Sequence, residues 1–220
     1  MAIAETLRSR FRPEWKQSDP SLHRMFENAL GFLEVPKRKK AEVEKAGTFN
    51  ARGVAEQLRC ELAKDIVPEL SRIRRELDAR LAATQRELAA LAKPEIDKAD
   101  AAAAVLRQET RTYLRGLSMG ERMQVLTDNP DLEIVAAALE GPPALSGLTA
   151  EHRAHVEQVY QEKHHRPALR AMEDREEAVA TVRAALDLAA MEIRGVVGLQ
   201  PHEFDEWFWT ADRTNARSIA

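Results

Sequence analysis

The chain has 220 residues, of which 44% are hydrophobic, 31% are charged and 5% are aromatic, and its formal net charge is −3. So small a net charge names no class of partner, and a single cysteine, Cys60, excludes an intramolecular disulfide. We expect Cys60 to be a small packing residue inside a helix. No stretch reaches the roughly 18–20 apolar residues of a membrane span, and the first residues lack a signal-peptide core. We therefore expect no membrane partner and a cytoplasmic location.

Residues 1–47 form the first predicted segment, a mixed N-terminal arm that is interrupted by prolines. A short amphipathic helix is predicted near residues 21–33, because apolar side chains recur there on one helical face. These side chains are Leu22, Met25, Phe26, Leu30 and Leu33. The arm is too small to fold alone, so this face is expected to dock on the rest of the chain or on a partner.

A run of four basic residues, Lys37, Arg38, Lys39 and Lys40, lies within the arm. Such a run can bind the phosphate backbone of a nucleic acid or an acidic neighbour. Glu42 and Glu44 follow it and weaken a basic patch. A solvated turn is therefore the favoured interpretation, and nucleic-acid binding through this run is the alternative.

A long helix is predicted over residues 51–93, with Thr48 or Asn50 as its N-cap. Pro68 predicts a kink near residues 64–68. Pro94 predicts the end of the helix, although a kinked helix that continues through Pro94 stays open. The apolar stripe of this helix recurs at steps of three and four and consists of Leu70, Ile73, Leu77, Leu81, Thr84, Leu88 and Leu91.

The next predicted helix is capped by Asp97 or Asp100. Its apolar seam consists of Ala99, Ala103, Leu106, Thr110, Tyr113 and Leu117. Residues 118–148 read as a small helical head. Its start and stop signals are a capping box at Ser118 and Glu121, a helix start at Asn129-Pro130-Asp131 and a stop at Gly141-Pro142-Pro143.

Thr149 is the predicted N-cap of the next segment. From Ala150 to about Val197 the chain is again predicted to be helical, with an interruption at Pro167. Its apolar stripe has the heptad spacing of the first one and consists of Met172, Val179, Val182, Leu186, Ala189, Ile193 and Val196. Only another helix buries such a stripe well. The predicted fold is therefore all-α, an elongated antiparallel helical hairpin or coiled-coil stalk over residues 48–198 that carries the small head.

Residues 199–220 are predicted to be a separate, polar C-terminal tail that holds four large aromatic side chains: Phe204, Trp207, Phe208 and Trp209. These side chains either fold back on the chain's own helices or anchor another subunit, since Trp and Phe supply much of the energy of protein interfaces. The tail is acidic and the first half of the chain is the more basic one, so a second copy is one candidate acceptor.

Four histidines, His152, His155, His164 and His165, fall close together, and Glu162 with His165 has the Glu-x-x-His spacing of di-metal helical bundles. Such a site needs a second pair, and the sequence holds none. No nucleophile elbow, phosphate-binding glycine loop or zinc spacing occurs either. We therefore predict no catalytic residue, no metal and no cofactor, and a metal-dependent bundle enzyme is the third and last alternative.

Several motifs in the middle of the chain carry a family resemblance. The segment from Glu109 to Leu117, then Glu121-Arg122, Asn129-Pro130-Asp131 and residues 136–148, resembles uncharacterised helical proteins encoded by phages and prophages of proteobacteria. The similarity covers residues 50–190 and is clearest over 106–148. Its motifs are helix edges and turns, so it implies a phage setting and carries over no site residue.

The expected function is that of a structural phage-associated protein, which packs against other protein subunits in or on a virion. Its expected location is the cytoplasm of the bacterial host or the virion. The alternative is a nucleic-acid-associated accessory protein that uses the basic N-terminal arm.

Overall fold

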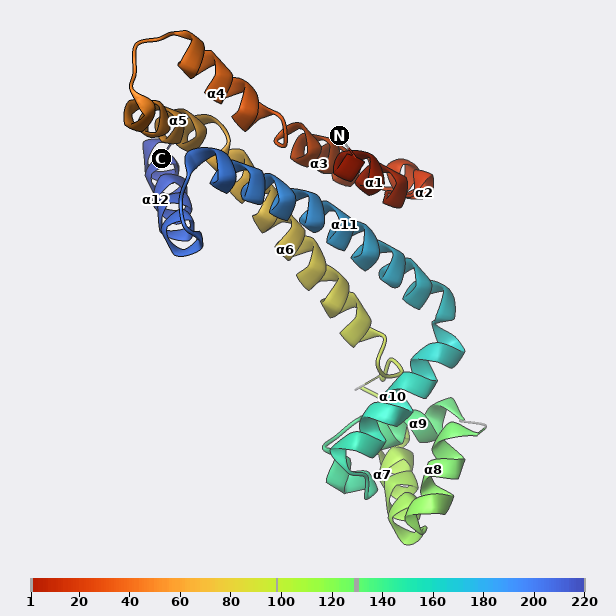
Figure 1. Cartoon of the computed structure of the whole chain (residues 1–220). Coiled ribbons are helices and arrows are strands. Elements are labelled where there is room, and N and C mark those ends of the chain that lie inside the picture. Colours follow the sequence, from red (N-terminus) through yellow and green to blue (C-terminus); the bar gives the residue numbers. More distant parts are fainter. Residues whose placement is uncertain (1, 98, 129–130, 220) are drawn as a thin grey trace. The chain divides into compact units, whose positions relative to one another are not determined.

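The computed structural model of this chain describes residues 2–97, 99–128 and 131–219. All regular secondary structure in these ranges is helical (Figure 1), so the all-α prediction is confirmed. None of the helices described there is long and apolar enough to cross a membrane. The α-helices are α1 (Ala2–Arg10), α2 (Pro13–Ser18), α3 (Pro20–Gly31), α4 (Val35–Lys45), α5 (Ala51–Asp65), α6 (Val67–Ala90), α7 (Ala101–Gly116), α8 (Met119–Thr127), α9 (Leu132–Leu139), α10 (Ala150–His164), α11 (Arg166–Val197) and α12 (Pro201–Ile219), with a 3-10 helix η1 (Pro143–Ser146) after α9.

The chain forms two compact units. Unit 1 comprises Met1–Ala82 and Arg175–Ala220, and unit 2 comprises Ala83–Asp174. Helices α6 and α11 each contribute residues to both units. The predicted arm and the predicted tail both belong to unit 1, whereas the segment predicted as a stalk is divided between the units.

In unit 1, α6 and α11 run antiparallel (Figure 1). Arg74 pairs with Asp187, and Asp78, one turn further along α6, pairs with Arg183, one turn earlier on α11. The two predicted apolar stripes meet between these helices. One core cluster holds their buried side chains, among them Leu70, Ile73, Leu77, Val179, Val182, Leu186, Ala189 and Ile193.

The N-terminal arm packs on this same core. Asp19 caps α3 by accepting a hydrogen bond of 2.9 Å from the backbone N–H of Leu22. Phe26 is buried and stacks on Phe11 from the α1–α2 turn, with ring centroids 4.5 Å apart. The predicted apolar face of residues 21–33 therefore docks on the chain's own helices, which removes the alternative of a partner for that face.

The predicted proline breaks lie between helices. The chain leaves regular helix at Ile66, between α5 and α6, inside the region where a kink was predicted. Pro68 then lies in the first turn of α6, where a missing backbone N–H costs no helical hydrogen bond. Helix α6 ends at Ala90, so helix does not continue through Pro94.

Unit 2 is built on the predicted capping residues. Asp100 caps α7, Ser118 forms the capping box of α8 with Glu121, and Thr149 caps α10. Asp131 caps α9, while the rest of that start signal, Asn129 and Pro130, lies outside the described residues. The buried core of unit 2 is small and consists of Leu114, Leu126, Val135, Ala138, Leu139, Leu148, Val156 and Tyr160.

The predicted apolar seam of α7 is wrong. Leu106 and Tyr113 are 63% and 56% exposed, and the buried face of α7 carries Arg107 and Leu114 instead. Arg107 is buried because its charge is paired with Glu140 at 3.2 Å, while its aliphatic stem contributes to packing. The spacing of apolar residues in a sequence does not identify an arginine that points inward.

Candidate protein-interaction surfaces

The predicted C-terminal tail is helix α12, and two of its four aromatic residues belong to the core of unit 1. Phe204 and Phe208 are one helical turn apart and buried, and Phe208 is only 2% exposed. The guanidinium group of Arg74 lies over the Phe208 ring, 5.3 Å from its centroid. As a correction to the prediction, Phe204 and Phe208 are occupied by the chain itself and offer no surface to a partner.

The turn before α12 explains why these residues fold back. Gly198 ends α11 with a φ of +66°, a conformation that glycine adopts at little cost, and its N–H bonds to the carbonyl oxygen of Arg194 at 3.0 Å. Pro201 then begins α12. These two residues turn the chain so that α12 packs on the core of unit 1, whereas residues 199–220 were predicted to be a separate tail.

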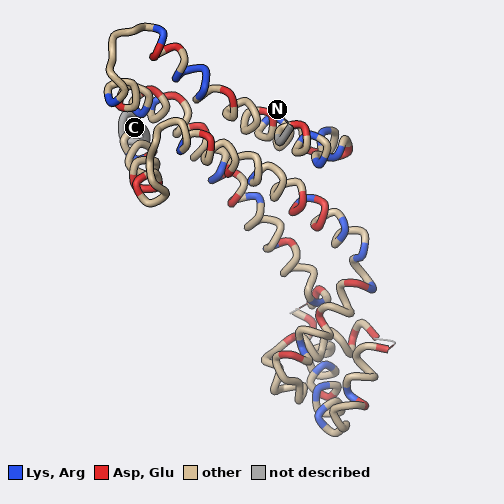
Figure 2. Tube along the Cα trace, viewed as in Figure 1, with Lys and Arg blue, Asp and Glu red and all other residues tan. Residues whose placement is uncertain are grey.

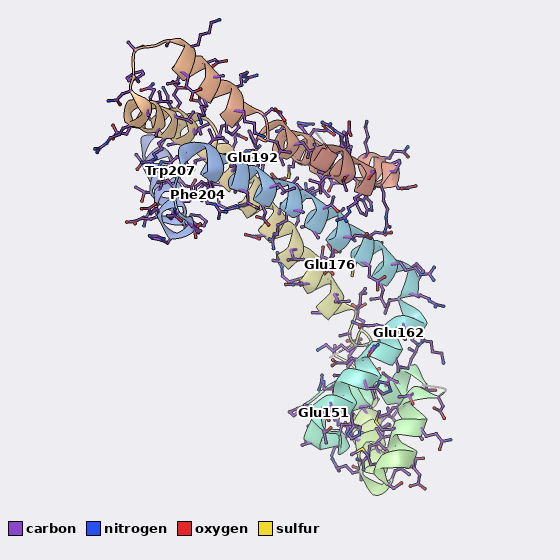
Figure 3. All side chains as sticks on the ribbon, viewed as in Figure 1. Glu151, Glu162, Glu176, Glu192, Phe204 and Trp207 are labelled. Carbon is purple, nitrogen blue, oxygen red and sulfur yellow. The ribbon has the colours of Figure 1, made fainter. Side chains whose placement is uncertain are left out.

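The side chains of the two tryptophans of α12 are partly accessible to solvent. Trp207 is half-buried and contacts Phe204, as the labelled side chains in Figure 3 show. Trp209 is 51% exposed and lies beside a hollow of about 310 Å³ with Arg75 and Asp78. These are the two predicted partner-binding residues that remain accessible.

An open groove of about 830 Å³ lies between α5 and α12 in unit 1. Its lining residues are Glu56, Arg59, Cys60, Ala63, Lys64, Glu203, Glu206, Trp207, Thr210, Ala211 and Thr214. Cys60 is exposed there, so the expectation that it packs inside the protein is wrong. In the sequence Cys60 lies in the middle of a helix between Arg59 and Glu61, and only the position of α12 identifies it as part of a groove.

The four basic residues of the run, which were predicted to form a solvated turn or, as the alternative, a nucleic-acid site, lie inside helix α4, so the turn is wrong. Each of them is paired with a carboxylate. Lys37 pairs with Glu192 of α11 at 2.9 Å, and Lys39 pairs with Asp65 and Glu61 of α5 at 2.6 and 3.4 Å. The two remaining pairs, Arg38–Glu42 and Lys40–Glu44, lie within α4 at 3.8 and 3.9 Å. Figure 2 shows basic and acidic residues following one another along this helix.

The pairing of the two lysines also affects their titration. The hydrogen bond that Lys37 donates to Glu192 raises the pKa of Lys37, and the one that Lys39 donates to Asp65 raises the pKa of Lys39. Both lysines therefore stay charged and bound to carboxylates on other helices. The run joins α4 to α5 and α11 within unit 1, and its charge is compensated inside the chain.

A face of α7 in unit 2 exposes large apolar side chains. Val105, Leu106 and Tyr113 are each more than half exposed, and they lie within about 100° of one another around the helix axis. We call these three residues the outer α7 face. Large apolar side chains that stay exposed on one side of a helix are a feature of association sites, although the exposed Glu109 lies among these three on the same side of α7.

The opposite side of α7 fixes the orientation of this face. Arg107 and Arg111 both bind the carboxylate of Glu140 at the end of α9, at 3.2 and 2.5 Å. Burial raises the pKa of Glu140, but the hydrogen bonds from Arg111 and Arg107 lower it further, so the pKa lies below its ordinary value. With its polar side held in this way, α7 cannot turn its apolar side inward without breaking these bonds.

Two of the four histidines weighed as candidate metal ligands bond to hydroxyl groups. The ring of His165 hydrogen-bonds the hydroxyl group of Tyr160 at 3.3 Å, and His152 bonds the hydroxyl of Thr149 at 2.8 Å. Glu162 accepts a hydrogen bond from Gln158 at 2.8 Å instead of facing His165. Within the residues that the structure describes, no three His, Cys, Asp or Glu side chains are grouped so as to hold a metal ion.

Comparison of the chain with protein-family models, with curated proteins and with solved structures found no match. Function is therefore inferred from the outer α7 face in unit 2 and from the groove between α5 and α12 in unit 1.

Proposed function

We propose that this chain is a structural phage-associated protein that packs against other protein subunits in or on a virion. The observation that carries the proposal is the outer α7 face. Burial of apolar surface is the main favourable term in protein association, and Val105, Leu106 and Tyr113 leave theirs in water. Apolar side chains on one helix suit a protein partner that supplies a helix or groove of its own.

The phage setting is supported by the resemblance to helical proteins of phages and prophages. That resemblance is clearest over residues 106–148, a range that includes most of α7. The proposed location is the cytoplasm of the bacterial host, where the chain is made, and then the virion.

We further propose that the α6–α11 pair is a coiled-coil stalk and that unit 2 binds other subunits through the outer α7 face. Two observations support the stalk. The buried side chains of both helices follow steps of three and four, and ion pairs such as Arg183–Asp78 lie along the pair.

The proposal is tested by asking whether the chain is present in particles purified from cells that encode it. Mass spectrometry of the particles is expected to detect the wild-type chain and to find a Leu106→Asp variant strongly depleted, because a charge on the outer α7 face opposes its burial. Gln108→Asp is the matched control, since Gln108 is an exposed residue of α7 that lies outside this face.

Two results would contradict the proposal. One is the absence of the wild-type chain from the particles. The other is incorporation of Leu106→Asp at the wild-type level, provided that circular dichroism shows its helices to be intact.

A further inference from the structure

The groove between α5 and α12 has walls of opposite charge. Arg59 and Lys64 lie on the α5 side, and Glu203 and Glu206 lie on the α12 side. A third carboxylate, Glu56, is also on the α5 side, where Arg52 neutralises it at 3.1 Å. The α5 wall is therefore basic and the α12 wall is acidic.

Of the four charged groups Arg59, Lys64, Glu203 and Glu206, the first and third form hydrogen bonds within the chain. Arg59 donates to the carbonyl oxygen of Val197 at 3.1 Å, and Glu203 accepts from the backbone N–H of Gln200 at 2.9 Å. In the part of the chain that the structure describes, Lys64 and Glu206 form no ion pair and no side-chain hydrogen bond, and both are exposed. One basic and one acidic group thus remain available, one on each wall.

We propose that this groove binds the same groove of a second copy of the chain. The inference rests on the proposed function, since it identifies one of the subunits with which the chain packs. A surface that is basic on one side and acidic on the other is complementary to itself after a half-turn. Closed two-fold dimers use such self-complementary patches, in which each residue of a contact pair occurs twice.

The charges also select the direction of the two-fold axis. A half-turn about an axis along the groove places the α5 wall of one copy against the α12 wall of the other, so Lys64 approaches the acidic wall of its partner. A half-turn about an axis across the groove places α5 against α5 and opposes like charges, which disfavours that arrangement. The axis therefore runs along the groove, and the four helices form a bundle.

The lining of the groove suits this packing. Cys60, Ala63 and Ala211 are small, so helices of a second copy can approach closely. Trp207, half-buried against Phe204, supplies a large aromatic anchor, the residue type most enriched in the energetic centres of interfaces. Dimer formation would cover the remaining surface of Trp207 and the thiol of Cys60.

The test measures the mass of the purified full chain in solution by light scattering and sedimentation. The wild-type chain is expected to be a dimer. Lys64→Glu and Glu206→Lys are each expected to raise the dissociation constant by roughly tenfold to hundredfold, because the two-fold axis doubles every like-charge contact. Mixing the two variants is expected to restore dimers, because the walls are acidic in one copy and basic in the other.

Lys93→Glu is the matched control, since Lys93 is an exposed residue of unit 2 and the change in charge is the same. A second measurement follows alkylation of Cys60, the single cysteine, in the unmutated groove. The thiol is expected to react more slowly as the wild-type concentration rises, and this protection is expected to be lost in Glu206→Lys.

The inference is overturned by a monomeric wild-type chain, by single variants that dimerise as tightly as Lys93→Glu, or by a mixture that stays monomeric. It is also overturned if Cys60 reacts at a rate that does not depend on concentration. These outcomes are separate from the particle test. A dimer that is absent from particles contradicts only the virion role, whereas a monomer that is present in particles contradicts only the self-association.

Discussion

The guanidinium group of Arg122 donates a hydrogen bond of 2.6 Å to the backbone carbonyl oxygen of Leu114. The same group donates to the carbonyl oxygens of Leu117, at 2.8 Å, and Gly147. Leu114 and Leu117 lie at the C-terminal end of α7, where the helix dipole is negative and the last carbonyl groups lack helical partners. Arg122, only 7% exposed, thus joins the end of α7 to α8 and to the turn after η1.

We predict that Arg122→Met destabilises unit 2 by about 2–4 kcal/mol, because it removes the charged donor from carbonyl groups at the end of α7 and after η1. Urea denaturation of the full chain measures this change. Arg170→Met serves as the control, since Arg170 is an exposed arginine of unit 2, and it should change stability little. Equal stabilities of the two variants would show that the bonds of Arg122 contribute nothing.

The second prediction concerns pH and Glu140. Its pKa in the folded chain lies below the ordinary value of 4.5, because Arg111 and Arg107 bind the charged form. Glu140 therefore stabilises the fold at pH values above 4.5, and this contribution is lost as the pH falls below 4.5 toward the lowered pKa. The difference in urea midpoint between the wild-type chain and Glu140→Gln should be largest near neutral pH and shrink in acid. Curves that stay parallel down to acid pH would contradict this.

The third prediction separates the aromatic residues of α12. Phe208→Ala should destabilise the chain by roughly 3 kcal/mol or more, since it opens a cavity in the core of unit 1. Trp209→Ala should change stability by less than about 1 kcal/mol, because half of that side chain is already exposed. Thermal unfolding of the two variants decides the matter. A larger loss for Trp209→Ala than for Phe208→Ala would contradict the placement of α12.

The fourth prediction is that the run Lys37–Lys40 does not bind DNA tightly. Each basic group there already faces a carboxylate, and contacts with phosphates would have to displace it. Fluorescence anisotropy with duplex DNA should show at most weak binding. Tight binding that falls by about 0.9 log unit per log unit of salt for each phosphate contact, and that is lost in Lys39→Glu but not in the exposed control Lys16→Glu, would contradict the prediction.

The parts of the fold that sequence reasoning predicted are those decided by nearby residues. A cap depends on one side chain and on the backbone two or three residues later, and Asn50, Asp100, Ser118 and Thr149 all cap helices as predicted. The same holds for the apolar face of α3, whose spacing follows from the helical repeat.

The parts that it missed depend on distant partners. Nothing near Arg107 shows that Glu140 will neutralise it, so the buried side of α7 was assigned to Leu106 and Tyr113. The groove likewise depends on α12 lying beside α5, far away in the sequence. One local signal was present: Phe204 and Phe208 are four residues apart, the spacing of one face of a helix.

The division of the chain into units has a consequence for its synthesis. Unit 2 is one continuous stretch, Ala83–Asp174, whereas unit 1 needs both ends of the chain. The first stretch of unit 1, which ends at Ala82, therefore leaves the ribosome before α11 exists to cover the apolar stripe of α6. All of unit 2 is made in the interval. Unit 2 can close through contacts that are short in sequence, which form quickly. The core of unit 1 can close only when α11 and α12 emerge, so helices made after unit 2 complete a core whose other helices were made before it.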